Sequence, residues 1–197
     1  MPAMHELLTR IVSDLVSLQA RHAVVGGHAV SARTEPRFTR DLDLAVAVGD
    51  DEHAEALVGA LGQRGYRVLA IVEQEATGRL ATVRLEHAST PGVVVDLLFA
   101  TAGVEPEVVA GATPLRVLAK LELPVASVGH LLALKTLSVD ERSRPQDRLD
   151  IVALLRVATA ADLRTAEQTL SLITQRGCHR GRDLSAMFAR MRAGSTS

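Results

Sequence analysis

The segment from residue 39 to residue 48 constrains the fold of this chain more than any other stretch of its sequence. Its side chains alternate between large apolar residues and acidic or small ones, and a β-strand places every second side chain on the same face. Asp41 and Asp43 therefore share one face of the strand, while Leu42 and Leu44 share the other. The pattern predicts a strand that buries its leucine face and presents two carboxylates on the opposite face.

A third acidic residue lies in an apolar run from Val93 to Phe99. Asp96 is the only charged residue of that run, and burying an unpaired carboxylate costs free energy. Hard divalent cations bind carboxylates together with substrate phosphates. We therefore expect Asp41, Asp43 and Asp96 to form an oxygen cage for Mg²⁺ or Mn²⁺. The alternative for Asp96 is an ion pair with an arginine at the end of its strand.

Two consecutive glycines, Gly26 and Gly27, separate a predicted strand at residues 22–25 from a predicted helix at residues 28–33. Because glycine has no Cβ, the backbone N–H groups of such a pair can approach phosphate oxygens, and the helix N-terminus favours negative charge. We predict that the pair binds phosphate, with a plain tight turn as the alternative. His28 begins the helix, where it could contact a phosphate or serve a structural role.

Apolar periodicity in the first half of the chain predicts alternating helices and strands. In order, we expect helices at residues 4–19, 28–33 and 50–63, and strands at residues 22–25, 39–48, 66–74, 80–87 and 93–100. The turn signal at residues 89–92 predicts that the last two strands form an antiparallel hairpin. This order of elements indicates an α+β fold with a mixed sheet.

The composition changes after residue 103, where prolines interrupt a sequence that otherwise has a helical pattern. We predict an edge strand at residues 121–125, and helices at residues 127–137, 145–157, 161–175 and 182–192. We accordingly divide the chain into a core at residues 1–104 and a mainly helical region at residues 105–197.

Bulk composition excludes several classes of protein. The formal net charge is −1, which by itself predicts neither nucleic-acid nor membrane binding. Cys178 is the only cysteine, so the chain can form no intramolecular disulfide and no multi-cysteine zinc site. No apolar run approaches the roughly 18–20 residues needed to cross a bilayer, and the N-terminus lacks the continuous apolar core of a signal peptide. We expect a cytoplasmic protein.

Charge is nevertheless unevenly distributed along the chain. Residues 142–192 contain ten arginines and five acidic residues, a local net charge of +5, so the rest of the chain is acidic. Such a basic region would suit an RNA acceptor, and an ordinary arginine-rich helical surface is the alternative. The chain has one tyrosine, three phenylalanines and no tryptophan, so we expect no extended platform for base stacking.

The glycine pair and the acidic strand together resemble a known family. The string Gly26–Val30 is followed by the string Asp41–Leu44, with thirteen residues between Gly27 and Asp41. This arrangement resembles the nucleotidyltransferase superfamily of the DNA polymerase β type, and the AbiEii/MenT-type nucleotidyltransferase toxins are the nearer match. In that group a GG-x-A-(V/L) opening leads to an R-x-(T/S)-x-D-(L/I)-D-L strand, which residues 37–44 fit throughout.

Two downstream blocks extend the resemblance to residues 22–155. Residues 131–135, followed by residues 144–150, look like the LLALK and RPKDLxDI elements of the toxin group. Between the two regions, residues 95–98 resemble the strand that carries the third carboxylate in the superfamily.

The resemblance implies a polymerase β-like nucleotidyltransferase core followed by helices that complete the active site. It implies metal-dependent transfer of a nucleoside monophosphate from an NTP to a hydroxyl. A tRNA 3′ end is the favoured acceptor, and the protein would be a growth-inhibiting toxin with a cognate antitoxin. Asp41 and Asp43 would bind the metals. Asp96 would join the metal that activates the nucleophile, or act directly as its base.

The same resemblance assigns roles to residues outside the carboxylate cage. Lys135, one of only two lysines, would neutralise the NTP phosphates, and a lysine that extends to solvent is the alternative. Asp150 would support Lys135 or the site, with Asp147 as the alternative for that role. Arg37 would contact phosphates or RNA, or simply lie on the surface. The predicted catalytic residues are Asp41, Asp43, Asp96, Lys135 and Asp150. The predicted nucleotide-binding residues are Gly26, Gly27, His28, Arg37, Lys135 and Asp147.

Two other functions remain open at this point. The same fold could transfer a nucleotide to an antibiotic or to a protein hydroxyl, or it could serve as a catalytically inactive binding module. An inactive module would be expected to have lost a carboxylate or the lysine, whereas Asp41, Asp43, Asp96 and Lys135 are all present.

Overall fold

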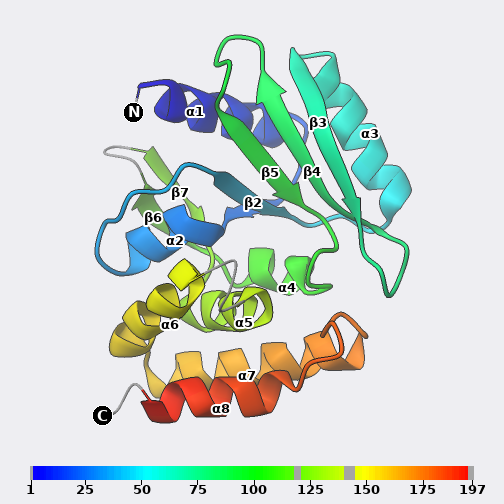
Figure 1. Cartoon of the computed structure of the whole chain (residues 1–197). Coiled ribbons are helices and arrows are strands. Elements are labelled where there is room, and N and C mark those ends of the chain that lie inside the picture. The colour runs from blue at the N-terminus through cyan, green and yellow to red at the C-terminus, as the bar shows by residue number, and fades with distance from the viewer. Residues whose placement is uncertain (1, 118–120, 140–144, 195–197) are drawn as a thin grey trace.

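The computed structural model of the chain describes residues 2–117, 121–139 and 145–194 (Figure 1). Its helices are α1 (Pro2–Ser17), α2 (Gly26–Arg33), α3 (Asp51–Gly62), α4 (Glu105–Ala110), α5 (Val128–Ser138), α6 (Pro145–Val157), α7 (Ala160–Gln175) and α8 (Leu184–Gly194). Its strands are β1 (His22–Val24), β2 (Leu42–Val46), β3 (Tyr66–Glu73), β4 (Leu80–His87), β5 (Val94–Leu98), β6 (Thr113–Val117) and β7 (Leu121–Val125).

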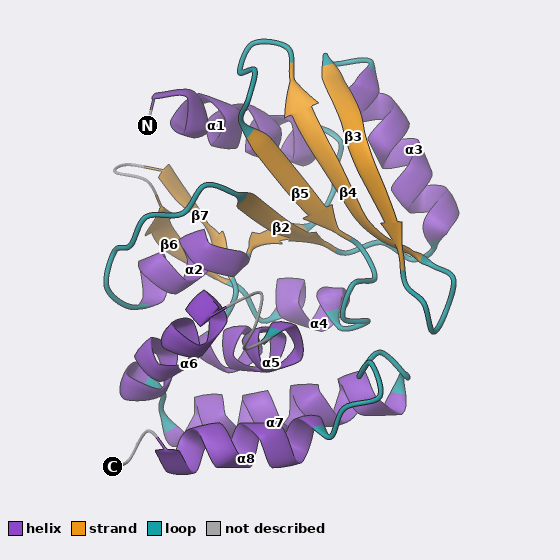
Figure 2. Ribbon diagram, in the orientation of Figure 1, coloured by secondary structure: helices purple, strands orange, loops and turns teal. Residues whose placement is uncertain are grey.

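The strands form one mixed sheet in the order β3-β4-β5-β2-β1-β7-β6. The pairs β2–β5 and β1–β7 are parallel, and the other neighbours are antiparallel. In the view of Figure 1, α1 and α3 lie behind β3–β5, and α5–α8 form a helical layer below the sheet. Figure 2 shows the same division, with strands in the upper part and the longest run of helices in the lower part. The predicted α+β fold with a mixed sheet is confirmed.

The central strands have the buried face that their alternation predicts. Leu42 and Leu44 on β2 and Leu97 on β5 are fully buried in the main core. Helix α1 adds four fully buried residues to this core: Leu7, Leu8, Ile11 and Leu15. Burying one such side chain contributes about 1.5–3 kcal/mol, so this layer fixes β2 and β5 and thereby the acidic residues on their other face.

Several local signals are confirmed at the residues that carry them. The side chain of Asp50 accepts a hydrogen bond from the backbone N–H of His53 and caps α3, and Ser127 caps α5 by accepting from His130. The β4–β5 hairpin forms around the turn at residues 89–92. Strand β2 is shorter than predicted, so Asp41 lies directly before the strand.

The strands after residue 105 correct one prediction. Residues 121–125 form β7 as predicted, but β7 lies between β1 and β6 instead of at the edge. The edge strand is β6, which the sequence pattern did not indicate. Pro114 and Pro124 face each other in this pair. A proline weakens a strand pattern because it cannot donate to the ladder, and β6 tolerates Pro114 because it has one unpaired edge.

None of the helices within the described residues is long and apolar enough to cross a membrane.

Candidate active site

Three charged residues form a row across three adjacent strands. The parallel pairing of β2 with β5 places Asp43 opposite Asp96, and the antiparallel pairing of β5 with β4 places Asp96 opposite Arg84. Directly opposed residues in paired strands project to the same side of the sheet. Asp96 therefore faces the same side as Asp43, which strand alternation alone could not decide.

Asp96 is held by Arg84 through both carboxylate oxygens. The Nε of Arg84 donates to Oδ1 of Asp96 over 2.8 Å, and Nη2 donates to Oδ2 over 2.6 Å. The arginine partner considered for Asp96 is thus present, across the strand pair rather than at its end. Sequence reasoning did not nominate Arg84, although a hairpin centred on Thr90 places residues 84 and 96 opposite each other.

The charges of all three predicted metal ligands act on the same guanidinium. Hydrogen bonds to Asp96 raise the pKa of Arg84 above its ordinary value, against the lowering effect of burial, and the charges of Asp96, Asp41 and Asp43 add to the increase. Asp41 itself is exposed, at the start of β2. These three carboxylates and Arg84 therefore share one electrostatic environment.

A cavity of about 490 Å³ lies between this face of the sheet and α5. Its polar lining includes Asp43, Arg84, Asp96, Lys135, Ser138 and Arg180. Its apolar lining includes Ala70, Val72, Leu98, Leu131, Leu134 and Leu137. Gly26 lies at one wall. A volume in this range, apolar walls and a few convergent charged groups are typical of a small-molecule site.

Gly26 is required at its position for two physical reasons. Its φ is +61°, in the left-handed region that glycine adopts without strain. A Cβ there would also lie 1.9 Å from Oδ2 of Asp43. The neighbouring Gly27 is tightly enclosed as well, since its Cβ would lie 2.6 Å from Oγ1 of Thr39. The glycine pair therefore allows the backbone at the start of α2 to lie directly against Asp43.

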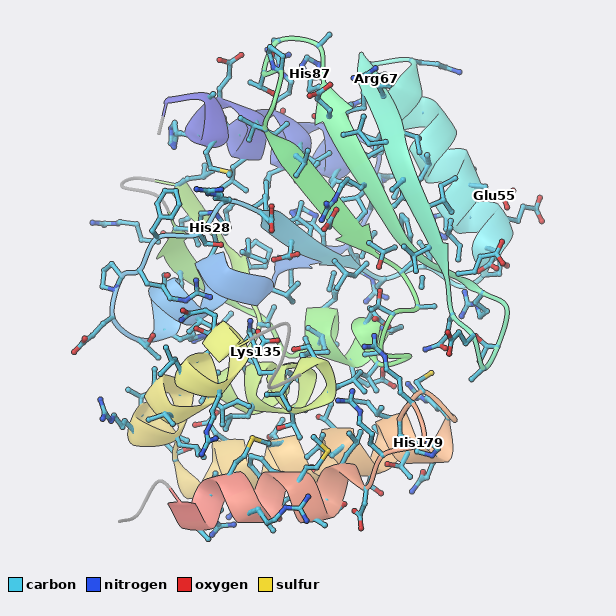
Figure 3. All side chains as sticks on the ribbon, viewed as in Figure 1. His28, Glu55, Arg67, His87, Lys135 and His179 are labelled. Carbon is cyan, nitrogen blue, oxygen red and sulfur yellow. The ribbon has the colours of Figure 1, made fainter. Side chains whose placement is uncertain are left out.

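Lys135 is anchored by two carboxylates of the next helix. Its Nζ lies 2.7 Å from Oδ1 of Asp147 and 2.8 Å from Oδ2 of Asp150. The two acidic residues are three positions apart on α6, so they share one face of that helix. The Lys135 side chain is 13% exposed and the Asp150 side chain 1%. Figure 3 places Lys135 where α5 and α6 meet the sheet-containing half.

Asp150 also binds Arg37 from the other half of the chain. The Nη2 of Arg37 donates to Oδ2 of Asp150 over 2.7 Å. Burial alone would raise the pKa of Asp150, but hydrogen bonds from Lys135 and Arg37 outweigh it, and the net direction is a lowered pKa. Arg37, Lys135, Asp147 and Asp150 thus form one buried cluster, which we call the helical cluster.

His28 lies inside the protein at the start of α2 (Figure 3). Burial, followed by the charge of Arg37, lowers its pKa, so the neutral ring is favoured. Its buried Nε2 has no hydrogen-bond partner among the described residues. A role for His28 in nucleotide binding stays a prediction.

The donor set on the sheet fits a hard cation. It consists of carboxylate oxygens, and Mg²⁺ is commonly held by one or two carboxylates with substrate phosphates and water as the remaining ligands. Among the described residues, no group of three or more His, Cys, Asp or Glu side chains is close enough to hold a metal ion. Asp43 and Asp96, in register on adjacent strands, are thus the best-placed ligands, and the three-carboxylate cage stays a prediction.

A second cavity, of about 630 Å³, lies between α7 and α8. It is lined mainly by Leu170, Phe188, Ala189, Glu167 and Arg192. It is larger than the first cavity, but none of the predicted site residues lines it. The cavity beneath the sheet is therefore the candidate active site.

Comparisons with known proteins agree with this geometry. Among solved structures, an antigenic nucleotidyltransferase-like protein from Paracoccidioides brasiliensis is 18% identical over 96% of this chain and 93% of that chain, with a TM-score of 0.56. The enzyme ANT(2″)-Ia in complex with adenylyl-2″-tobramycin is 16% identical over 95% of this chain and 96% of that chain, with a TM-score of 0.50. MenT4 from Mycobacterium tuberculosis H37Rv is 17% identical over 87% and 85%, with a TM-score of 0.34. No curated protein matched the sequence.

The first two of these likenesses show a nucleotidyltransferase fold, and the family assignment comes from the sequence. Residues 7–193 match the family described as the nucleotidyl transferase AbiEii toxin of type IV toxin–antitoxin systems. Because this match covers nearly the whole chain, the protein belongs to the AbiEii nucleotidyltransferase toxin family and is an enzyme of the nucleotidyltransferase class.

Proposed function

We propose that this protein is a metal-dependent toxin that transfers a nucleoside monophosphate from an NTP to the 3′ end of a tRNA in the cytoplasm. Mg²⁺ or Mn²⁺ would be its cofactor, and a cognate antitoxin would neutralise it. The modified tRNA could no longer be aminoacylated, which would stop translation and growth.

One observation carries the proposal: two in-register carboxylates face the same cavity as a buried lysine and a glycine-rich helix start. Asp43 and Asp96 come from adjacent strands, Lys135 comes from α5, and Gly26 begins α2. Nucleotidyl transfer needs cation ligands and a positive charge for the triphosphate on opposite sides of one pocket. The buried Arg84–Asp96 and Lys135–Asp150 pairs hold these groups in position before substrate binds.

In the proposed reaction, the acceptor hydroxyl oxygen attacks the α-phosphorus of the NTP. A new P–O bond forms while the bond from that phosphorus to the oxygen bridging the α- and β-phosphates breaks, and pyrophosphate leaves. Asp41 and Asp43 would hold divalent cations, which lower the pKa of the attacking hydroxyl and neutralise the leaving phosphates. Asp96 would share in cation binding or accept the hydroxyl proton, and Lys135 would bind the phosphates.

Charge in the cavity favours an RNA acceptor over a cationic antibiotic. Arg84, Lys135 and Arg180 line the cavity, and its only acidic lining residues are the two proposed cation ligands, within the described part of the chain. An aminoglycoside would need additional carboxylates to pair with its amines, whereas RNA phosphates are attracted to arginine and lysine. The net charge of +5 over residues 142–192 supports the same choice.

The test is a transfer assay with each of the four labelled NTPs, Mg²⁺ or Mn²⁺, and total tRNA. We expect label on the tRNA 3′ end, loss of that label in Asp41→Ala, and its retention in Asp183→Asn, which changes an exposed helix cap outside the cavity. Label on an aminoglycoside or on protein would replace tRNA as the acceptor. Absence of transfer to any acceptor would contradict the proposed activity.

A further inference from the structure

Arg84 occupies both oxygens of a carboxylate that the proposed reaction needs. Its two donor nitrogens, Nε and Nη2, each bind a different oxygen of Asp96. Two parallel charge-assisted hydrogen bonds of this kind are among the strongest in proteins. A cation can therefore bind Asp96 at full strength only when Arg84 gives up at least one of these bonds.

The two partners differ in their freedom to move. The Asp96 side chain is 12% exposed and projects from β5, which is hydrogen-bonded to a strand on each side. The Arg84 side chain is 44% exposed and lines the cavity. The guanidinium can therefore swing into the cavity while the carboxylate stays in place.

We propose that Arg84 competes with the divalent cation for Asp96, so that the site takes up the cation together with the NTP and not before it. A cation at Asp96 would be repelled by the adjacent guanidinium. The triphosphate removes this repulsion, because its oxygens accept hydrogen bonds from Arg84 and its negative charge balances both cations. This inference rests on the proposed function, since it assumes that the carboxylate row binds a cation.

A second arginine–carboxylate pair on the same sheet provides a matched control. Arg67 on β3 faces Glu86 on β4, and its Nη2 donates to Oε2 of Glu86 over 2.7 Å. Neither residue lines the cavity. Removing the arginine of this pair changes the charge of the protein by the same amount without freeing a carboxylate in the site.

The experiment measures Mn²⁺ binding by the electron paramagnetic resonance signal of free Mn²⁺. The purified full chain is titrated with Mn²⁺ alone, and then with Mn²⁺ in the presence of whichever α,β-methylene NTP analogue binds best. In the unaltered protein we expect the analogue to tighten Mn²⁺ binding about ten-fold or more, within the usual range of coupling between two ligands. In Arg84→Gln, binding of Mn²⁺ alone should tighten about five-fold or more, and the further gain from the analogue should shrink.

The controls separate this inference from the proposed function. Arg67→Gln should bind Mn²⁺ as the unaltered protein does, and adding Asp96→Asn to Arg84→Gln should abolish the gain. Arg84→Lys keeps the charge with a single donor group, so its Mn²⁺ affinity should fall between the two; this variant also serves if the glutamine variant fails to fold. Equal Mn²⁺ affinity in Arg84→Gln, Arg84→Lys and the unaltered protein would overturn the competition while leaving the metal site intact. Absence of Mn²⁺ binding in every variant, with or without each analogue, would overturn both the competition and the proposed metal dependence.

Discussion

The two halves of the candidate site hold their charges in different ways. On the sheet, Asp43, Asp96 and Arg84 form a row along the wall of an open cavity, and Arg84 is nearly half exposed. In the helical cluster, Lys135 and Asp150 are buried and their charged groups bind each other. The sheet half is therefore arranged to receive charge from a ligand, and the helical cluster is already close to electrically balanced.

This difference predicts that the two halves respond differently to substitution. Removing a carboxylate from the open row should affect chemistry much more than folding, because water can solvate what remains. Removing a carboxylate from the helical cluster should affect both, because it leaves buried positive charge without a partner. The following predictions test this contrast, from the largest expected effect to the smallest.

Asp43→Asn should lower the transfer rate by about 10³-fold or more, the scale expected when a preorganised charged group is lost from an active site. Its melting temperature should change less than that of Asp150→Asn. Both quantities are measured on the same preparation, by labelled-nucleotide transfer and by thermal unfolding. A variant that keeps near-normal transfer would place the chemistry outside the carboxylate row.

Asp150→Asn should destabilise the protein by about 3 kcal/mol, since it leaves Lys135 and Arg37 without a shared carboxylate in a buried site. For a chain of this length the melting temperature should fall by about 6–12 °C, and transfer should fall as well. Urea unfolding measures the free-energy change.

The matched control for that variant is Glu167→Gln. Glu167 pairs with Arg192 over 3.1 Å, and both side chains are more than half exposed. Exposed pairs contribute about 0–1 kcal/mol, so this variant should unfold almost as the unaltered protein does. Equal stability losses in the two variants would remove the distinction between the buried cluster and the surface.

Gly26→Ala should destabilise the protein by about 1–2 kcal/mol from backbone strain at positive φ. It should also reduce transfer, because the new methyl group would collide with Asp43. Gly181→Ala isolates the strain: Gly181 has a φ of +66°, and its Cβ would meet no atom within 4 Å. If the two variants lose the same activity, the contact between Gly26 and Asp43 has no catalytic importance.

His28 should give the smallest effect, a change in the pH dependence of stability. Its folded-state pKa is lowered below the ordinary value of 6.5 by burial. The unfolded chain therefore binds more protons as the pH falls below that value, and the free energy of unfolding decreases. His28→Gln should flatten this dependence between about pH 7.5 and about pH 5.5.

Urea unfolding across this range measures the slope for both proteins. Some slope should remain in the variant, because burial also lowers the pKa of His22 and His130. An unchanged slope would mean that His28 does not titrate differently in the folded and unfolded states.

Local patterns in the sequence predicted much of the site because short-range geometry fixes them. Alternation in β2 placed Asp43 on the face opposite the buried leucines, and the turn signal after residue 88 fixed the β4–β5 hairpin. A spacing of three residues on α6 put Asp147 and Asp150 on one face of that helix. Each of these inferences depends on residues fewer than about ten positions apart.

Other parts of the site depend on contacts between distant residues. Arg37 and Asp150 are 113 positions apart, and no repeat or spacing in the sequence links them. Arg180 reaches the cavity from the connection between α7 and α8. Strand β6 was missed because Pro114 weakens its pattern and only pairing with β7 defines it as a strand.

The sequence by itself determined the residue types, the carboxylate-bearing strands, the glycine pair and the family, because strand and helix periods convert spacing into shared faces. The tertiary structure alone decided which charges meet. It paired Asp96 with Arg84, joined Arg37 and Lys135 through Asp150, and brought α5 against the carboxylate face of the sheet. These contacts depend on strand order and helix packing, which are set by burial of the whole core and not by any local pattern.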